Sequence, residues 1–153
     1  MQPILNGNKG VSIIEILIAI TIITIALASV LSLANFSLKA ASLTKETTKA
    51  NAISQEAMEA VRSIRDSDWA KLTPGSHGLT SAAGFWDFTG TENVINGFTR
   101  TILIENVSRD PTTDNIEITY NPANNDPNTK KITATVSWKS KEVKIITYLT
   151  NWR

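Results

Sequence analysis

Residues 9–36 read KGVSIIEILIAITIITIALASVLSLANF. After Gly10 the run holds 26 residues with one charged side chain, Glu15. A helix of that length extends about 39 Å, more than the hydrocarbon core of a bilayer, which is about 30 Å thick. Lys9 precedes the run, and positive charge before a span favours keeping the leader in the cytoplasm. This stretch therefore predicts a helix that spans the membrane once, close to the N-terminus.

Glu15 separates this run from three simpler interpretations. These are a cleaved secretory signal with its small-residue site at residues 26–28, a plain single-span anchor, and a buried core helix. The run is too long and too uniformly apolar for the core helix of a small domain. A carboxylate in a spanning helix costs roughly 2.5–3.5 kcal/mol at mid-depth and less near the interface. A signal or a plain anchor gains nothing from Glu15, so we expect a partner that offsets its cost.

The segment from Lys9 to Glu15, KGVSIIE, resembles the processing site of type IV pilins and pseudopilins. The resemblance implies that a prepilin peptidase cuts after Gly10 and methylates the new amine of Val11, which leaves Glu15 fifth in the mature chain. Val11 stands where the family most often has phenylalanine. The resemblance covers about the first 36 residues. It implies four partners: the peptidase/methyltransferase, other pilin subunits, an inner-membrane assembly platform, and membrane lipid before assembly.

The spacing of Val11 and Glu15 gives this resemblance a physical basis. Cleavage would create an amine about 6 Å along the helix axis from the carboxylate. In staggered subunits, Glu15 of one stem could pair with the Val11 amine of a neighbour, since an unpaired charge in an apolar bundle is costly. One polar contact of this kind sets axial register, as a buried polar residue does in a coiled coil.

The helix is predicted to continue past the apolar run, because no glycine or proline occurs between residues 11 and 73. This predicts one helix of about 55–60 residues, or two that run on. After Lys39 the pattern becomes amphipathic, with one apolar stripe at helical spacing. The stripe consists of Leu43, Ala50, Ile53, Ala57, Val61, Ile64 and the pair Asp68-Trp69. We therefore divide the chain into a leader (1–10), an apolar stem (11–38), an amphipathic half (39–72) and a head (73–153).

The head is predicted to be a β-sheet. Strands are expected at residues 98–107, 115–120, 131–138 and 143–152, with a turn at 139–142. Residues 84–88 predict a short strand or an aromatic plug, and residues 73–78 a loop rich in helix breakers. Sequential strands joined by short turns give an antiparallel sheet, so the fold class is α+β with the long helix across the sheet. The pilin resemblance implies the same architecture.

Composition argues against an enzyme. The net charge is +1, so strong attraction to nucleic acid is not expected. The chain has no cysteine and one histidine, His77, which we place in an exposed loop. It has no glycine-rich phosphate loop, nucleophile elbow or cluster of metal ligands. We expect no catalytic residue, no metal and no cofactor.

Two polar regions admit a binding role. Lysines gather near the C-terminus, and Lys139, Lys141 and Lys144 could contact DNA in an uptake pseudopilin, although solvent-facing lysines also protect strand edges. Residues 110–131 are rich in Asp and Asn, which suits Ca²⁺, but they lack the regular Asp-x-Asp-x-Asp-Gly spacing and equally suit turns. Asn35 and Asn106 begin tripeptides of the glycosylation type.

The expected function is structural: a pilin or pseudopilin that enters the inner membrane as a single-pass precursor and joins a cell-surface or periplasmic filament. Many major pilins carry a proline in the apolar stem, and residues 11–38 have none. Thr21, Thr24, Ser29 and Ser32 could soften the stem instead, through hydroxyl bonds to the backbone. This departure favours a minor pilin or pseudopilin. The alternatives are a DNA-uptake pseudopilin and a simple membrane-tethered binding domain.

Overall fold

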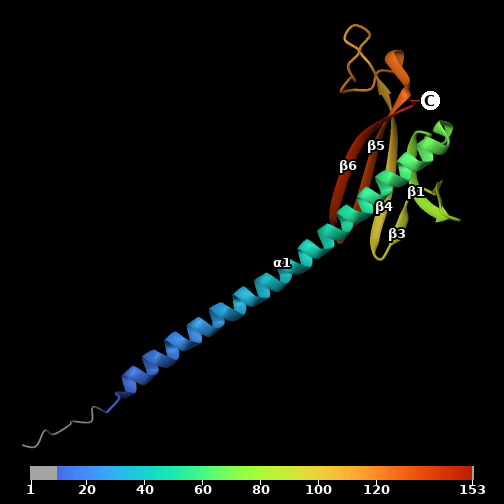
Figure 1. Cartoon of the computed structure of the whole chain (residues 1–153). Coiled ribbons are helices and arrows are strands. Elements are labelled where there is room, and N and C mark those ends of the chain that lie inside the picture. Colours follow the sequence, from blue (N-terminus) through green and yellow to red (C-terminus); the bar gives the residue numbers. More distant parts are fainter. Residues whose placement is uncertain (1–9, 153) are drawn as a thin grey trace, which may run out of the picture. The chain divides into compact units, whose positions relative to one another are not determined.

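The computed structural model describes residues 10–152 and consists of one long helix followed by a β-sheet (Figure 1). Helix α1 (Ile13–Ser67) has 55 residues, so of the two predicted alternatives the structure has the single helix and not two that run on. It ends at Ser67, before the predicted limit at residue 72, because Asp68 adopts an extended conformation (φ −159°, ψ 111°). The Asp68 carboxylate accepts a hydrogen bond from the Ala70 amide (2.9 Å) and caps the short 3₁₀ turn η1 (Trp69–Lys71).

The sheet is antiparallel throughout and has six strands, which confirms the α+β class. Its order is β2-β1-β4-β5-β6, and β3 pairs with β4. The strands are β1 (Gly75–Ala82), β2 (Phe85–Thr89), β3 (Asn93–Ile95), β4 (Phe98–Ser108), β5 (Asn125–Trp138) and β6 (Lys141–Thr150), with the 3₁₀ turn η2 (Pro122–Asn124) before β5. The predicted strands near residues 84–88, 98–107, 131–138 and 143–152 are confirmed.

The β5–β6 hairpin is tighter than predicted. Trp138 pairs with Lys141, so only Lys139 and Ser140 form the turn. Both have positive φ (42° and 63°), the conformation of a two-residue turn that matches the right-handed twist of its strands. Lys141 therefore belongs to a strand and not to the expected four-residue turn.

The chain forms two compact units, Met1–Thr44 and Lys45–Arg153. In the second unit, one stripe of α1 packs on one face of the sheet. The buried stripe confirms most of the predicted positions and consists of Ala50, Ile53, Ala57, Val61 and Ile64, joined by Ser54, Met58 and Ala60. The sheet contributes Ile102, Ile104, Ile132, Ala134 and Val136, which lie on one face of β4 and β5. Three alanines in the stripe let the helix backbone approach the strands closely. Leu43, also predicted for the stripe, is exposed.

Residues 115–120 do not form the predicted strand. Only an isolated bridge between Arg109 and Ile116 occurs there, and Ile118 is fully exposed. The segment meets the side of β4 that β5 leaves free, but the contact is short. The Glu117 amide donates to the Ser108 carbonyl oxygen (2.9 Å) and the Asp110 amide to the Asn115 carbonyl oxygen (2.9 Å), which is too little to form a strand pair.

Strand β1 lies where the sequence predicted a loop. Gly78 allows it, because a Cβ at this position would lie 2.5 Å from the Thr89 carbonyl oxygen and 2.6 Å from Glu92. The glycine that signals a breaker is thus a point of close backbone approach within the sheet. His77, predicted in an exposed loop, lies in β1. Its Nε2 is 2.8 Å from the Thr73 carbonyl oxygen, and its ring contacts Phe88 at 4.8 Å between centroids.

Candidate processing and assembly site

The predicted cleavage site lies just before the helix. Gly10, Val11 and Ser12 are exposed and non-helical, and α1 begins at Ile13. No atom lies within 4 Å of the place where a Gly10 side chain would begin. Gly10 and Val11, which flank the predicted cleavage point, are thus both exposed in this unit. The leader residues 1–9 lie outside the described residues.

Ser12 caps the start of the helix. Its carbonyl oxygen accepts hydrogen bonds from the amides of Glu15 (3.0 Å) and Ile16 (3.3 Å). Glu15 is the third helical residue, which gives Ser-x-x-Glu the spacing of a capping box. Negative charge in the first helical turn also interacts favourably with the helix dipole. Glu15 therefore has a local electrostatic role in addition to any contact with a neighbouring subunit.

The stem presents bare apolar surface. Every residue from Gly10 to Lys45 is exposed, although a window of the helix reaches a mean hydropathy of 2.7. Such a surface in a single chain has to be covered by lipid or by other apolar helices. The helix is long and apolar enough to cross a membrane.

Three hydroxyl groups in the stem donate hydrogen bonds to the helix itself. Thr21, Thr24 and Ser29 donate to the carbonyl oxygens four residues earlier, at 2.8, 2.8 and 2.9 Å. These bonds remove the cost of an unpaired hydroxyl in an apolar medium. They also compete with the backbone amides for the same carbonyls, as predicted for three of the four residues proposed to soften the stem.

A family comparison bears directly on this site. Residues 5–31 match the family model described as the prokaryotic N-terminal methylation motif. No curated protein and no solved structure matches the chain. The chain thus carries a methylation motif of the type IV pilin kind, and the motif supports a pilin-like precursor. The family is structural, and the motif implies processing by a prepilin peptidase and assembly with other pilins.

The three lysines predicted for DNA contact lie in the β5–β6 hairpin, where two of them form ion pairs. Lys139 lies in the β5–β6 turn and donates to Glu46 of α1 at 2.7 Å. Lys144 lies on β6 and pairs with Glu142 at 2.8 Å. The Trp138 indole also donates to Glu46 (3.1 Å). The hydrogen bond from Lys139 and, to a smaller extent, the one from Trp138 hold the pKa of the Glu46 carboxyl below its usual value.

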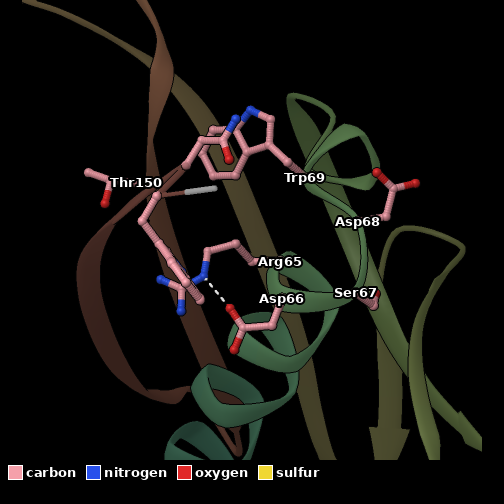
Figure 2. A pocket seen from close by; sticks show the side chains of 8 residues that line it. Arg65, Asp66, Ser67, Asp68, Trp69 and Thr150 are labelled. Atoms are coloured by element: carbon pink, nitrogen blue, oxygen red, sulfur yellow. Dashed lines mark hydrogen bonds and ion pairs between the residues drawn. The ribbon is translucent and has the colours of Figure 1, made fainter.

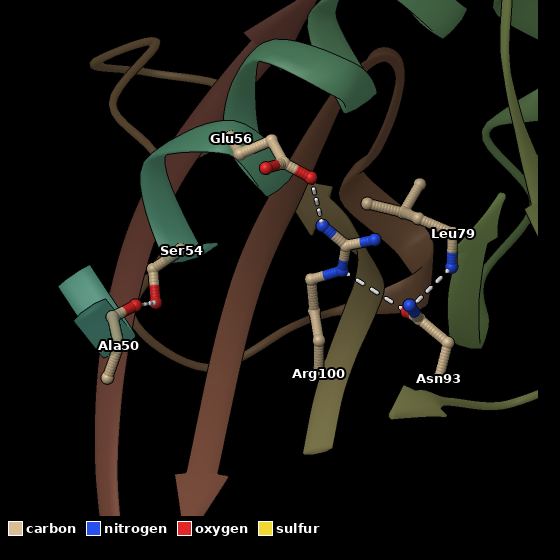
Figure 3. A network of polar contacts seen from close by, with 6 residues as sticks. All are labelled: Ala50, Ser54, Glu56, Leu79, Asn93 and Arg100. Atoms are coloured by element: carbon tan, nitrogen blue, oxygen red, sulfur yellow. Dashed lines mark hydrogen bonds and ion pairs between the residues drawn. The ribbon is translucent and has the colours of Figure 1, made fainter. Parts of the chain in front are cut away.

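A buried arginine, missed in the sequence, joins helix and sheet (Figure 3). Arg100 is 2% exposed and pairs with Glu56 of α1 (2.9 Å), while its Nε donates to the Asn93 Oδ1 of β3 (3.2 Å). The same Asn93 oxygen accepts from the Leu79 amide of β1 (3.1 Å), and the guanidinium lies 5.7 Å from the Trp86 ring centroid. One signal was present: Arg100 shares the inward alternation of Phe98, Ile102 and Ile104.

A small recess lies where α1 ends beside the end of β6 (Figure 2). It measures about 210 Å³ and lies between residues 65–69 and residues 150–152. Arg65 pairs with Asp66 at 2.9 Å at its edge. Within residues 10–152, no group of three or more His, Asp or Glu side chains is placed to hold a metal ion.

The polar groups of the 110–131 loop bind one another. Arg109 pairs with Asp126 (2.7 Å) and donates to the Asp114 carbonyl (2.9 Å), and Asp110 accepts from the amides of Thr112 and Thr113 (2.8 Å each). Burial raises the pKa of the Asp126 carboxyl, but hydrogen bonds from Thr129 and Arg109 outweigh it and leave the pKa below its usual value. The loop is thus folded by its own ion pair and turns.

The side chain of Asn106, which begins one of the two glycosylation-type tripeptides, is hydrogen-bonded within the sheet. Lys130 Nζ donates to Asn106 Oδ1 at 2.6 Å across the β4–β5 pair. Asn35, the other sequon, lies on the exposed stem.

Proposed function

We propose that the protein is a structural subunit, a pilin or pseudopilin, of a type IV pilus or a type II secretion-like filament. The observation that carries this proposal is the combination of the methylation motif at residues 5–31 with a bare apolar helix that continues unbroken into the head. The absence of proline from residues 11–38 favours a minor subunit or a pseudopilin.

In this proposal, the chain divides as the sequence predicts: a leader (1–10), an apolar stem (11–38), an amphipathic half (39–72) and a head (73–153). The precursor enters the inner membrane with its head outside the cytoplasm. The peptidase cuts between Gly10 and Val11 and methylates Val11. An assembly platform then moves the stem from lipid into a bundle of neighbouring stems.

The transfer costs little because each stem exchanges lipid for other apolar side chains. Glu15 sets the axial register between neighbouring stems in the bundle. Its carboxylate would pair with the Val11 amine of a neighbour, and leaving either charge unpaired in the bundle would cost several kcal/mol. A subunit out of register is therefore rejected.

The test is Glu15→Leu, with Thr21→Leu as the matched control that also replaces a polar stem residue by leucine. We expect both variants to be cleaved after Gly10, as measured by the mass of the N-terminal peptide. Filaments sheared from cells should fall at least about tenfold for Glu15→Leu, since removal of one partner of a buried pair costs about 3–5 kcal/mol. Normal filament yield from Glu15→Leu would refute the proposed role of Glu15.

A further inference from the structure

Charge is unevenly distributed within the second compact unit, Lys45–Arg153, although the chain as a whole is nearly neutral. Residues 45–49 and 139–144 together carry five lysines and two glutamates. The remaining residues of the unit Lys45–Arg153 carry eight basic and eleven acidic side chains. The two short segments thus have a net charge of +3, while the much longer remainder of the unit has a net charge of −3.

These two segments lie together in space. Glu46 of α1 accepts from Lys139 Nζ (2.7 Å) and from the Trp138 indole (3.1 Å), which fixes the β5–β6 turn to the helix. Lys49 lies 5.3 Å from the centroid of the Phe98 ring, which in turn contacts Trp138. We call this group the basic end; it consists of Lys45, Lys49, Lys139, Lys141 and Lys144, all of them exposed.

The basic end follows the apolar stem closely along the chain. Lys45 is nine residues after Phe36, or about 14 Å along a helix. The polar headgroup layer of a bilayer adds about 5–7 Å beyond the hydrocarbon on each side. Lysine side chains extend their ammonium groups over several ångströms, and charge at a surface acts over a Debye length of about 8 Å.

The turn also offers groups that suit a phosphate. A recess of about 430 Å³ beside it is lined by the ammonium-bearing Lys139 and Lys141, by the hydroxyl residues Thr99, Ser137 and Ser140, and by Glu142, whose carboxylate pairs with Lys144. Ammonium and hydroxyl groups are hydrogen-bond donors to phosphate oxygens. Lys141 forms no ion pair within residues 10–152, so its ammonium is available to an outside anion.

We propose that the basic end binds the phosphate headgroups of anionic phospholipids and holds the head of the unassembled precursor against the membrane surface. Extraction into a filament would then release these contacts. The inference rests on the membrane-anchored precursor but not on filament assembly. Its failure would therefore leave the proposed role of Glu15 untouched.

The experiment uses the full chain in nanodiscs of phosphatidylcholine mixed with phosphatidylglycerol. After release, native mass spectrometry gives the ratio of the two lipids that remain bound. We expect phosphatidylglycerol to be enriched among the lipids bound to the parent chain. At low salt, this enrichment should fall about fivefold for each lysine replaced, first in Lys141→Gln and further in Lys139→Gln/Lys141→Gln. The loss should shrink at high salt.

Lys71→Gln/Lys130→Gln is the matched control, since it removes two charges outside the basic end. Lys141→Gln disrupts no ion pair of the described chain, so this variant should keep the thermal unfolding temperature of the parent. Equal lipid ratios in parent and Lys141→Gln would overturn the proposal, as would an equal loss in the control. Preferential binding of duplex DNA over phosphatidylglycerol vesicles, lost in the same variants, would also overturn it and favour nucleic acid.

Discussion

The two halves of helix α1 share one backbone and have opposite surroundings. From Gly10 to Lys45 every residue is exposed, although nearly half are large and apolar. From Ala50 to Ile64 one stripe is buried, and three of its residues are alanines that bring the helix close to the sheet. The difference teaches that the head, taken together with the part of α1 that packs on its sheet, contains the contacts that stabilise it. The stem needs lipid or other subunits to cover its apolar surface. Variants in the two halves should therefore differ in what they damage.

The largest contrast is expected between truncations of matching size. Ile64 is 1% exposed and packs in the core of the head, whereas Leu27 is 60% exposed on the stem. Ile64→Ala should lower the free energy of unfolding of the head by about 2–5 kcal/mol, because it leaves a cavity. Leu27→Ala should leave that free energy unchanged. Urea unfolding of the detergent-solubilised chain, followed by tryptophan fluorescence, checks both; equal effects would break the comparison.

Two glycines sharpen the same contrast. Gly78→Ala should destabilise the head by about 1–3 kcal/mol, since the new Cβ would meet the Thr89 carbonyl oxygen at 2.5 Å and force the backbone apart. Gly10→Val should cost the fold nothing, because no atom lies within 4 Å of that position. The motif predicts instead that Gly10→Val blocks cleavage. Thermal melts and the size of the N-terminal peptide read out the two effects, and a cleaved, stable Gly10→Val chain would contradict the second.

Two arginines pair with glutamates of α1 and differ in burial: Arg100 lies on β4 and is buried, whereas Arg62 lies on α1 and is partly exposed. Arg100→Leu should cost about 1–3 kcal/mol, because it removes the link from β4 to Glu56 and Asn93. The loss stays below that of a fully buried pair, since the Glu56 side chain is 50% exposed and can be hydrated. Arg62→Leu removes only an exposed pair with Glu59 and should cost less than about 0.5 kcal/mol. A double-mutant cycle of Arg100 with Glu56 measures the pair, and a coupling near zero would show that Arg100 acts through Asn93 and packing and not through Glu56.

The smallest effect concerns acid. The pKa of Asp126 in the folded head is below its usual value, so its contribution to stability is present above about pH 4 and is lost as the pH falls through the folded pKa. Asp126→Asn should therefore reduce the loss of stability between about pH 5 and about pH 2 by less than about 1 kcal/mol. Urea titrations across that range test this. An unchanged slope would mean that other carboxylates dominate.

The sequence predicted best where a pattern was long and local. The 55-residue helix follows from the absence of breakers, and the β5–β6 hairpin from strict alternation in residues 131–138. Gly10, Val11 and Glu15 were named through the resemblance of residues 9–15 to a pilin processing site, and the family match covers these residues, while their roles stay predictions.

It failed where tertiary contacts decide. Residues 115–120 have the composition of a strand, but they form only one bridge, Ile116 with Arg109, in a loop that the Arg109–Asp126 ion pair helps to fold. Residues 75–82 have the composition of a loop, yet Gly78 is needed for close approach between backbones. Arg100 looked like any charged strand residue, because its partner Glu56 lies 44 positions away on the helix.

The most direct test of the account is the mass and sequence of the mature N-terminus, measured on protein from cells that contain the prepilin peptidase. The account predicts a chain that begins at Val11 and carries one added methyl group on its amine. A chain that begins at Ser29 would indicate an ordinary secretory signal, and one that begins at Met1 a plain anchor. Either result would contradict the pilin-like processing that gives Glu15 its proposed partner.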